Sequence, residues 1–144
     1  VSATLKVGER IRTYNPWNKE CLIPVKNIGG KVGFQLHPEN RALVPTGLIF
    51  DIPDKHVLKM FIRSSTALKK GLVLANGVGI IDSDYVEESY IMVYNISDSL
   101  VVINGGERLA QVALEKTCPY TLSEITDKPA QKTSRDGGFG STGN

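Results

Sequence analysis

The sequence predicts an all-β fold, either a sandwich or a barrel. Its strand-like segments are short, rich in β-branched residues and separated by Gly, Pro, Asn or Asp about every eight to twelve residues. Helical signals are scarce, because apolar residues do not keep helical spacing over three turns. Residues 65–74 come nearest to such a stretch, but they are few and run into glycine-rich sequence.

The expected strands follow one another between residues 43 and 114. They are residues 43–44, 48–50, 57–62, 71–74, 90–94, 100–103 and 109–114. Residues 90–94 are almost all apolar, which predicts a strand buried on both faces. Residues 104–106, Asn-Gly-Gly, suit a tight turn between two strands, because Asn and Gly tolerate positive φ.

Length and composition are those of one globular domain. The chain has 144 residues, of which 41% are apolar and 22% are charged. Its net charge of +2 is too small to predict binding to nucleic acid or to a membrane, so neither partner is expected. No run approaches the roughly 18 apolar residues of a membrane span, and the alternating residues 1–12 do not resemble a signal peptide. We therefore expect a soluble intracellular protein.

Cysteine and histidine, the usual ligands of zinc, are sparse. Cys21 and Cys118 lie far apart in the sequence and match no metal-binding spacing, so two reduced thiols are expected. His37 and His56 have no partner cluster, which argues against a zinc site held by the protein.

The composition changes near the C-terminus. Residues 128–144 are rich in Gly, Ser and Thr, and Phe139 is their one aromatic residue. Such a segment has too little apolar surface to fold alone. The sequence therefore predicts a β-sandwich domain over residues 1–127 and a flexible C-terminal arm over residues 128–144.

Arg63, Ser64 and Ser65 form the first segment with binding chemistry. An arginine fork beside two hydroxyl groups suits a phosphate group. A surface turn explains the same tripeptide equally well.

Residues 76–85 form the second such segment. An apolar pair comes directly before Asp82, so the carboxylate is expected at the end of a buried strand, where it can orient a water molecule. An Asp-Ser-Asp turn by itself more often serves in capping or turn formation.

Two further segments carry polar groups that become informative only in combination. Residues 105–111 form a turn into a strand that carries Arg108 and Gln111. Residues 135–143 form a glycine-rich loop whose backbone N–H groups and hydroxyls suit an anion. Phe139 in that loop could cap a planar base.

Taken in order, these segments resemble motifs two to five of the trimeric dUTPases. The matching stretches read Arg-Ser-Ser, Gly-Ile-Ile-Asp-Ser-Asp-Tyr, Gly-Glu-Arg-Leu-Ala-Gln and Arg-Asp-Gly-Gly-Phe-Gly-Ser-Thr-Gly. The resemblance runs from about residue 22 to the C-terminus. One motif would be weak, but four in register identify the chain as a divergent member of the family, with a virus as one candidate source.

The resemblance implies a fold, an assembly and an activity. The fold is the dUTPase β-sandwich, which is related to a jelly roll, and the assembly is a homotrimer with the C-terminal arm exchanged between subunits. The activity is hydrolysis of dUTP to dUMP and pyrophosphate, with Asp82 as the base that activates a water molecule. Mg²⁺ is expected as the cofactor, held by the phosphates and water rather than by protein side chains.

The resemblance also assigns roles in binding the substrate. Asn76 and the backbone of a hairpin over residues 76–85 would read the uracil edge, Tyr85 would lie under the deoxyribose, and Phe139 would stack on uracil. The phosphate contacts would come from Arg63, Ser64, Gln111, Arg135, Ser141 and Thr142. The remaining members of the predicted binding set are Ser65, Gly79 and Gly140.

Three stretches depart from the family pattern. The first motif, usually Ala-Gly-x-Asp-Leu, reads Val-Gly-Phe-Gln-Leu at residues 32–36, so that Gln35 replaces a carboxylate. The family's Tyr-Arg-Gly-Glu reads Tyr-Val-Glu-Glu at residues 85–88. The connection from Leu36 to Val44 is short, and a trimmed hairpin is expected there.

Two alternatives stay open from the sequence. A dCTP deaminase shares the Arg-Ser-Ser segment, but its base is a Glu further along the chain and its tail lacks the Gly-Phe-Gly-Ser-Thr-Gly loop. A non-catalytic nucleotide-binding or regulatory protein on the same fold is the second, and the departures at Gln35 and Val86 favour it. Retention of Asp82 argues against it, because a pure binder needs no carboxylate to orient water.

Overall fold

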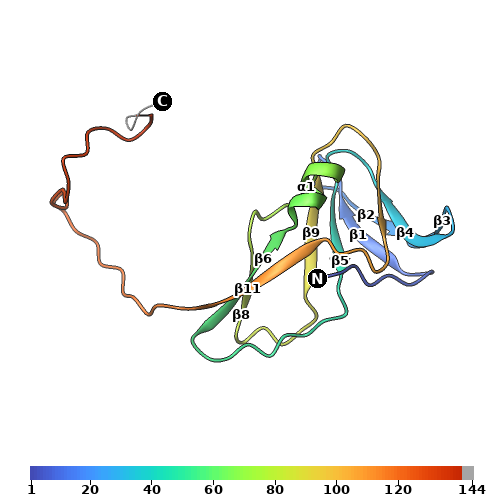
Figure 1. Cartoon of the computed structure of the whole chain (residues 1–144), viewed down its shortest axis with the longest axis horizontal. Helices are drawn as coiled ribbons and strands as arrows, with labels where there is room; N and C mark the ends of the chain where they lie inside the picture. Colours follow the sequence, from blue (N-terminus) through green and yellow to red (C-terminus); the bar gives the residue numbers. More distant parts are fainter. Residues whose placement is uncertain (141–144) are drawn as a thin grey trace.

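A computed structural model describes residues 1–140, which contain eleven strands and one short helix (Figure 1). Short antiparallel strands account for most of the regular structure, as the sequence predicted. In order, the elements are β1 (Arg10–Tyr14), β2 (Glu20–Pro24), β3 (Lys26–Ile28), β4 (Lys31–Leu36), β5 (Arg41–Pro45), β6 (His56–Ile62), α1 (Ser64–Lys70), β7 (Leu72–Leu74), β8 (Gly79–Asp82), β9 (Tyr90–Asn95), β10 (Val101–Asn104) and β11 (Ala110–Lys116).

The strands form three antiparallel sheets around one core. One sheet has five strands in the order β2-β1-β5-β9-β7, and the others have three each, in the orders β10-β4-β3 and β11-β6-β8. Buried apolar side chains from all three sheets, such as Val93, Phe34 and Met60, belong to the same hydrophobic cluster. The prediction of an all-β sandwich is therefore confirmed.

Strand β9 shows how the five-stranded sheet meets this core. Ile91 and Val93 are fully buried, whereas Tyr90 and Met92 keep 44% and 39% of their surface exposed. The expectation that residues 90–94 are buried on both faces is wrong for the single chain. Successive side chains of a strand point to opposite faces, and only the inner face of this sheet packs against the core.

Two other expectations differ from the structure for local reasons. Residues 48–50 form no strand, although the carbonyl of Leu48 accepts a hydrogen bond from the N–H of Ser89 at 2.9 Å. Residues 65–74 divide into helix and strand at Gly71, whose φ of 65° ends α1 in the left-handed conformation. The N–H of Gly71 donates to the carbonyl of Ala67 at 3.1 Å, which is a common way for a helix to end.

The first forty residues contribute strands that the sequence did not predict. β1 pairs with β2 and with β5, and the amino group of Val1 donates to the carbonyl of Ala110 at 2.8 Å. Trp17, in the turn between β1 and β2, is exposed and does not belong to the core.

The connection after Leu36 is not the expected trimmed hairpin. β4 pairs with β3 and β10, whereas β5 pairs with β1 and β9, so residues 37–40 cross from one sheet to another. Buried Asn95 stabilises this crossing, because its side-chain amide donates to the carbonyl of Leu36 at 3.0 Å. The backbone carbonyl of Asn95 accepts a hydrogen bond from the N–H of Glu39 at 2.8 Å.

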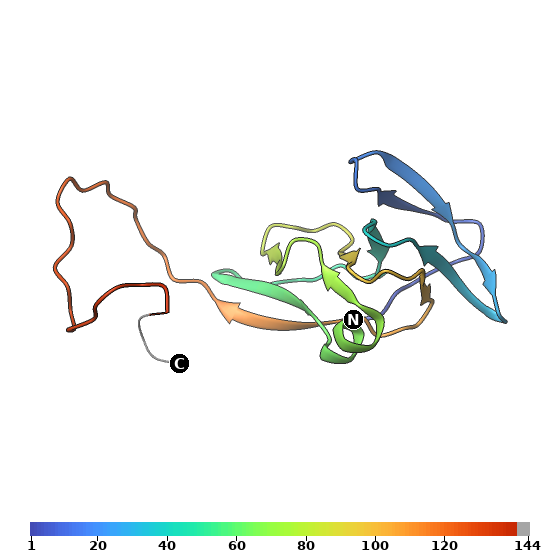
Figure 2. The same cartoon turned by 90° about the horizontal axis from the view of Figure 1, so that it is seen from above.

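The segment after β11, residues 117–140, leaves the body of the protein (Figure 2). It contains no helix or strand, and all its residues are exposed. Apolar Leu122 and Ile125 lie in this segment without entering the core. The division of the chain at residue 127 stays a prediction. Within the described residues, no helix is long and apolar enough to cross a membrane.

Candidate nucleotide-binding site

Residues 76–85 pass from one sheet to another. β7, just before them, pairs with β9 in the five-stranded sheet. Within residues 76–85 the one strand is β8, which pairs with β6, so these residues do not form the expected hairpin. The turn between β7 and β8 is tight: the N–H of Gly77 donates to the carbonyl of Leu74 at 3.0 Å. Gly77 has a φ of 73°, a conformation that glycine adopts without strain.

An opening lies beside this crossing and is lined by residues of both sheets, so we name it the inter-sheet cavity. Its volume is about 300 Å³. Three residues of the predicted binding set, Asn76, Gly79 and Tyr85, line it, and the other lining residues come from both sheets and their connections. The complete lining is Leu43, Met60, Asn76, Gly79, Ile80, Ile81, Tyr85, Ser89, Tyr90 and Met92.

Gly79 marks a close approach of β8 to β6. A Cβ atom at this position would lie 3.0 Å from the Cβ of Met60, tighter than ordinary contact. A larger residue would push β8 away from β6 and change the wall of the inter-sheet cavity.

Glu88 holds the loop that follows β8. The hydroxyl of Tyr85 donates to the carbonyl of Glu88 at 2.7 Å, and the carboxylate of Glu88 accepts from the N–H of Gly47 at 2.8 Å. The Tyr90 hydroxyl donates to the same carboxylate at 3.3 Å. Partial burial, the negative charge of Glu88 and this hydrogen bond raise the pKa of Tyr90 above its usual value. Glu88 was missed as a site residue, although it stands where the family motif also has Glu.

Asp82 ends β8 at the edge of its sheet. It pairs with Val57 on β6 and is exposed, directly after the buried, cavity-lining Ile81. Ile81 is the one buried residue of β8, so the strand is half-buried and not the buried strand that was expected. The carboxylate is therefore open to water and to a ligand beside the inter-sheet cavity.

The predicted phosphate-binding residues of the body gather at the other end of the same sheet. Arg63 comes directly before α1, and its guanidinium donates to the carbonyl of Arg108 at 3.2 Å. Ser64 and Ser65 are exposed in the first turn of α1. Gln111 is exposed on β11, where it pairs with Phe61. Arg63, Ser64 and Gln111 therefore form one polar surface.

This polar surface lies far from Asp82, as the register of the strands shows. Asp82 lies opposite Val57 and Gln111 lies opposite Phe61, so the two side chains are four residues apart along β6 and on opposite sides of it. Strand geometry then gives about 13 Å along the strands and about 10 Å across them. A single chain does not bring these two groups of residues together.

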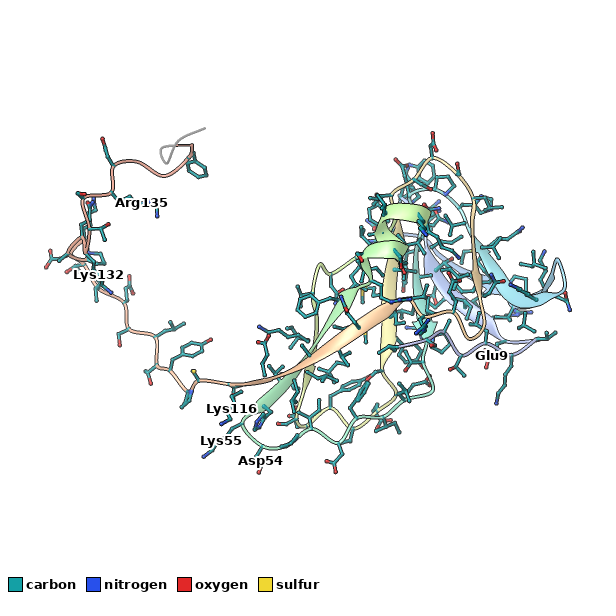
Figure 3. The ribbon with its side chains drawn as sticks, viewed as in Figure 1. Glu9, Asp54, Lys55, Lys116, Lys132 and Arg135 are labelled. Carbon is teal, nitrogen blue, oxygen red and sulfur yellow. The ribbon has the colours of Figure 1, made fainter. Side chains whose placement is uncertain are left out.

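Arg135, in the segment after β11, lies away from the body of the protein (Figure 3). The guanidinium of Arg135 donates to the carbonyl of Gly137 at 3.2 Å, within the same segment. The Phe139 side chain is fully exposed, and Gly140 has a φ of 73°. Ser141 and Thr142 lie outside the described residues.

Metal ligands and the first-motif position complete the description of the predicted site. In residues 1–140, no three His, Cys, Asp or Glu side chains are grouped so that they could hold a metal ion. Gln35 lies in β4, half-buried and paired with Val102, between the buried Phe34 and Leu36.

The chain is thus an all-β sandwich with a small, largely apolar cavity beside an exposed carboxylate. The dUTPase family model matches residues 31–143, and the chain belongs to that family. The chain is 39% identical over 117 residues to the deoxyuridine 5'-triphosphate nucleotidohydrolase of Rhizobium etli (strain CIAT 652), a match that covers 81% of this chain and 74% of that protein.

Two solved structures have a similar fold. The dUTPase from Streptococcus mutans is 28% identical, with a TM-score of 0.56 and coverage of 69% of this chain and 88% of that one. The Staphylococcus bacteriophage 80alpha dUTPase is 20% identical, with a TM-score of 0.61 and coverage of 82% and 89%.

Proposed function

We propose that this chain hydrolyses dUTP to dUMP and pyrophosphate. One observation carries the proposal: a single segment, residues 76–85, both lines the inter-sheet cavity and ends β8 with the exposed carboxylate of Asp82. Membership of the dUTPase family and the name of the Rhizobium etli relative support the same activity.

The inter-sheet cavity suits a pyrimidine base. It is lined mainly by apolar side chains with a few polar groups, the usual character of a site for a flat heterocycle. In this proposal Asn76 and the backbone near Gly79 contact the base edge, and Tyr85 lies against the deoxyribose. The Tyr85 hydroxyl already donates a hydrogen bond to the carbonyl of Glu88, so the ring is held in place before the substrate binds.

Asp82 would act as the general base. Its carboxylate orients a water molecule in line with the α-phosphorus and accepts a proton as the water oxygen bonds to that phosphorus. The bond between the α-phosphorus and the bridging oxygen to the β-phosphate breaks, and pyrophosphate leaves. The exposure of Asp82 at a strand end supports this role, because both water and substrate can reach it.

The phosphate contacts would come from another copy of the chain. Arg63, Ser64, Ser65 and Gln111 supply donors for the triphosphate, but they lie far from Asp82 of the same chain. Residues of one subunit would therefore complete the cavity of its neighbour in a homotrimer.

The outer face of the five-stranded sheet offers a surface for that assembly. Leu43 pairs with Met92 and Pro45 with Tyr90, so these apolar side chains adjoin on the face turned away from the core. Grooves of about 580 and 320 Å³ border them. An exposed apolar surface of this kind is typical of a protein interface. Leu43, Tyr90 and Met92 also line the inter-sheet cavity, so a second copy on this face would lie beside the bound base.

The C-terminal arm would close over the nucleotide of a neighbouring subunit. Arg135, Ser141 and Thr142 would contact the β- and γ-phosphates, and Phe139 and Gly140 would cover the base. The extended, exposed course of residues 117–140 supports this reach across subunits (Figure 1). Ordering such a segment costs conformational entropy. The free energy gained from the phosphate contacts must be larger than this cost.

Mg²⁺ fits this site as a companion of the substrate. It prefers oxygen ligands and usually keeps several waters when it binds phosphates, with one or two carboxylates from the protein. In this proposal the triphosphate and water hold the metal, with the exposed Asp82 close by. When bound, it would neutralise charge on the phosphate chain. An intracellular location remains a prediction from the sequence.

Pyrophosphate release tests the proposed function. The full chain is incubated with Mg²⁺ and dUTP, dTTP, dCTP or UTP, and ammonia release from dCTP is measured in parallel. We expect release from dUTP well above the other three and no deamination. Ammonia from dCTP would favour the deaminase alternative, and nucleotide binding without turnover would favour the non-catalytic one.

A further inference from the structure

Ser89 lines the inter-sheet cavity and combines deep burial with an unpartnered hydroxyl group. It comes directly before β9, lines the cavity and is 3% exposed. Among residues 1–140, its Oγ is the one buried side-chain oxygen or nitrogen without a hydrogen-bond partner. Buried hydroxyls nearly always have such a partner, so this one needs an explanation.

The backbone of Ser89 is held from two sides. Its N–H donates to the carbonyl of Leu48 at 2.9 Å, and its carbonyl accepts from the Thr46 hydroxyl at 2.6 Å. These backbone hydrogen bonds fix the position of Ser89 without using its side chain. The hydroxyl group is therefore free to form a hydrogen bond with a ligand.

The other hydroxyl groups of the inter-sheet cavity already have partners. The Tyr85 hydroxyl donates to the Glu88 carbonyl, and the Tyr90 hydroxyl donates to the Glu88 carboxylate. The rest of the lining is apolar apart from Asn76 and Gly79. A ligand with a flat apolar body and a polar edge would thus meet the Ser89 hydroxyl as a fixed and available polar group.

We propose that Ser89 Oγ hydrogen-bonds to the pyrimidine base of the bound nucleotide and helps to select that base. This inference rests on the proposed function, because it assigns the inter-sheet cavity to the base. A serine hydroxyl can donate to a ring carbonyl or accept from a ring N–H, so both sides of a uracil edge are compatible with it. Ser89 binds substrate in this account and takes no part in the chemical step.

A specific combination of effects follows for Ser89→Ala. Removing a buried hydroxyl that has no partner in the free protein should not destabilise it, because no hydrogen bond is lost. The same change removes a contact to the substrate in both the ground state and the transition state. That loss raises KM and leaves kcat nearly unchanged.

Ser97→Ala is the matched control. Ser97 lies beyond the opposite end of β9, and its hydroxyl donates to Asn95 Oδ1 at 2.7 Å. Its removal breaks a bond of the free protein without touching the inter-sheet cavity, so it should lower the Tm and leave KM unchanged.

The experiment compares the full-length parent chain, Ser89→Ala and Ser97→Ala by thermal unfolding, dUTP kinetics and calorimetric titration with dUMP. For Ser89→Ala we expect an unchanged or higher Tm, a KM raised about three- to tenfold, kcat within about twofold and a Kd for dUMP raised in parallel. Inhibition by inorganic triphosphate, which has no base, should be unchanged.

Two results would overturn the role of Ser89. One is a KM for dUTP and a Kd for dUMP that match those of the parent chain. The other is a fall in Tm as large as that of Ser97→Ala, since the hydroxyl would then have a partner inside the protein.

Failure of the proposed function gives a different result. The parent chain would then release no pyrophosphate from dUTP, while the dUMP titration, which needs no turnover, would still decide the role of Ser89. Weaker dUMP binding by Ser89→Ala would support that role, and equal binding would overturn it. A parent chain that binds no dUMP would contradict both proposals.

Discussion

Residues 76–85 and the segment after β11 carry two halves of the predicted nucleotide site, and the fold holds them in different ways. The first is fixed by the pairing of β8 with β6 and by the hydrogen bonds of Tyr85 and Glu88. The second is exposed throughout its described part and has no regular structure (Figure 2). In the proposed function, the base-binding half is therefore built before substrate arrives, whereas the phosphate-binding arm would depend on a ligand and a neighbouring subunit.

Asp82→Asn tests the half that the fold fixes, and we expect the largest effect from it. The change keeps the shape of the side chain but removes the base, so kcat should fall by about 10³-fold while nucleotide binding and the trimer persist. Pyrophosphate release, dUMP titration and light scattering measure the three properties. Near-normal turnover would show that Asp82 is not the base.

Truncation before Arg135 tests the other half. Residues 117–140 add nothing to the core, so the shortened chain should keep the Tm and the assembly of the parent. Its turnover of dUTP should fall by about 10²-fold, because several phosphate donors are lost. An unfolded truncated chain would show that the arm is structural, and full activity would remove Arg135 and its neighbours from the site.

Met92→Lys tests the surface on which the two halves would meet. Met92 lies on the outer face and lines the inter-sheet cavity, so a charge there should dissociate the trimer and lower activity by about tenfold or more. Leu68→Lys is the control, since Leu68 is an exposed apolar residue on α1, away from the outer face. Light scattering should give the mass of a single 15.7 kDa chain for Met92→Lys and three times that mass for the control. An intact Met92→Lys trimer would exclude this face.

Tyr85→Ala sharpens the assignment of the inter-sheet cavity and has the smallest expected effect. If the ring packs against C2′ of the sugar, UTP is a poor substrate of the parent, at a penalty of about 1–3 kcal/mol. The variant should use UTP about tenfold better relative to dUTP and still reject dTTP and dCTP. Comparison of kcat/KM for the four nucleotides measures this change. Equal use of UTP and dUTP by the parent would show that Tyr85 does not exclude the 2′-hydroxyl.

The sequence predicted the strands that combine β-branched residues with clear turn residues. Residues 57–62, 90–94 and 109–114 correspond closely to β6, β9 and β11. It did not predict β1 to β4. Strands β2 and β3 are almost wholly exposed, and β1 and β4 interleave polar residues with buried ones. Residues 48–50 have the composition of a strand but do not pair with a neighbouring strand, which shows how far strand formation depends on tertiary context.

The candidate site could be predicted in part for the same reason. Local motifs pointed to Asn76, Gly79 and Tyr85, and the structure brings these together around one cavity. The partners of β7 and β8 depend on contacts distant in the sequence, so the crossing between sheets was read as a hairpin. Ser89 was missed because its small polar side chain becomes informative only when its burial and its missing partner are known.

Mixing two inactive variants tests most directly whether the two halves come from different subunits. Asp82→Asn supplies an intact arm, and the chain truncated before Arg135 supplies an intact Asp82. The two are unfolded together, refolded into mixed trimers and assayed for pyrophosphate release from dUTP, with each variant treated alone as the control. We predict that the mixture regains a substantial fraction of the parent activity, because some of its sites combine Asp82 of one chain with the arm of another. Mixed trimers that form but stay as inactive as the separate variants would contradict a site shared between subunits.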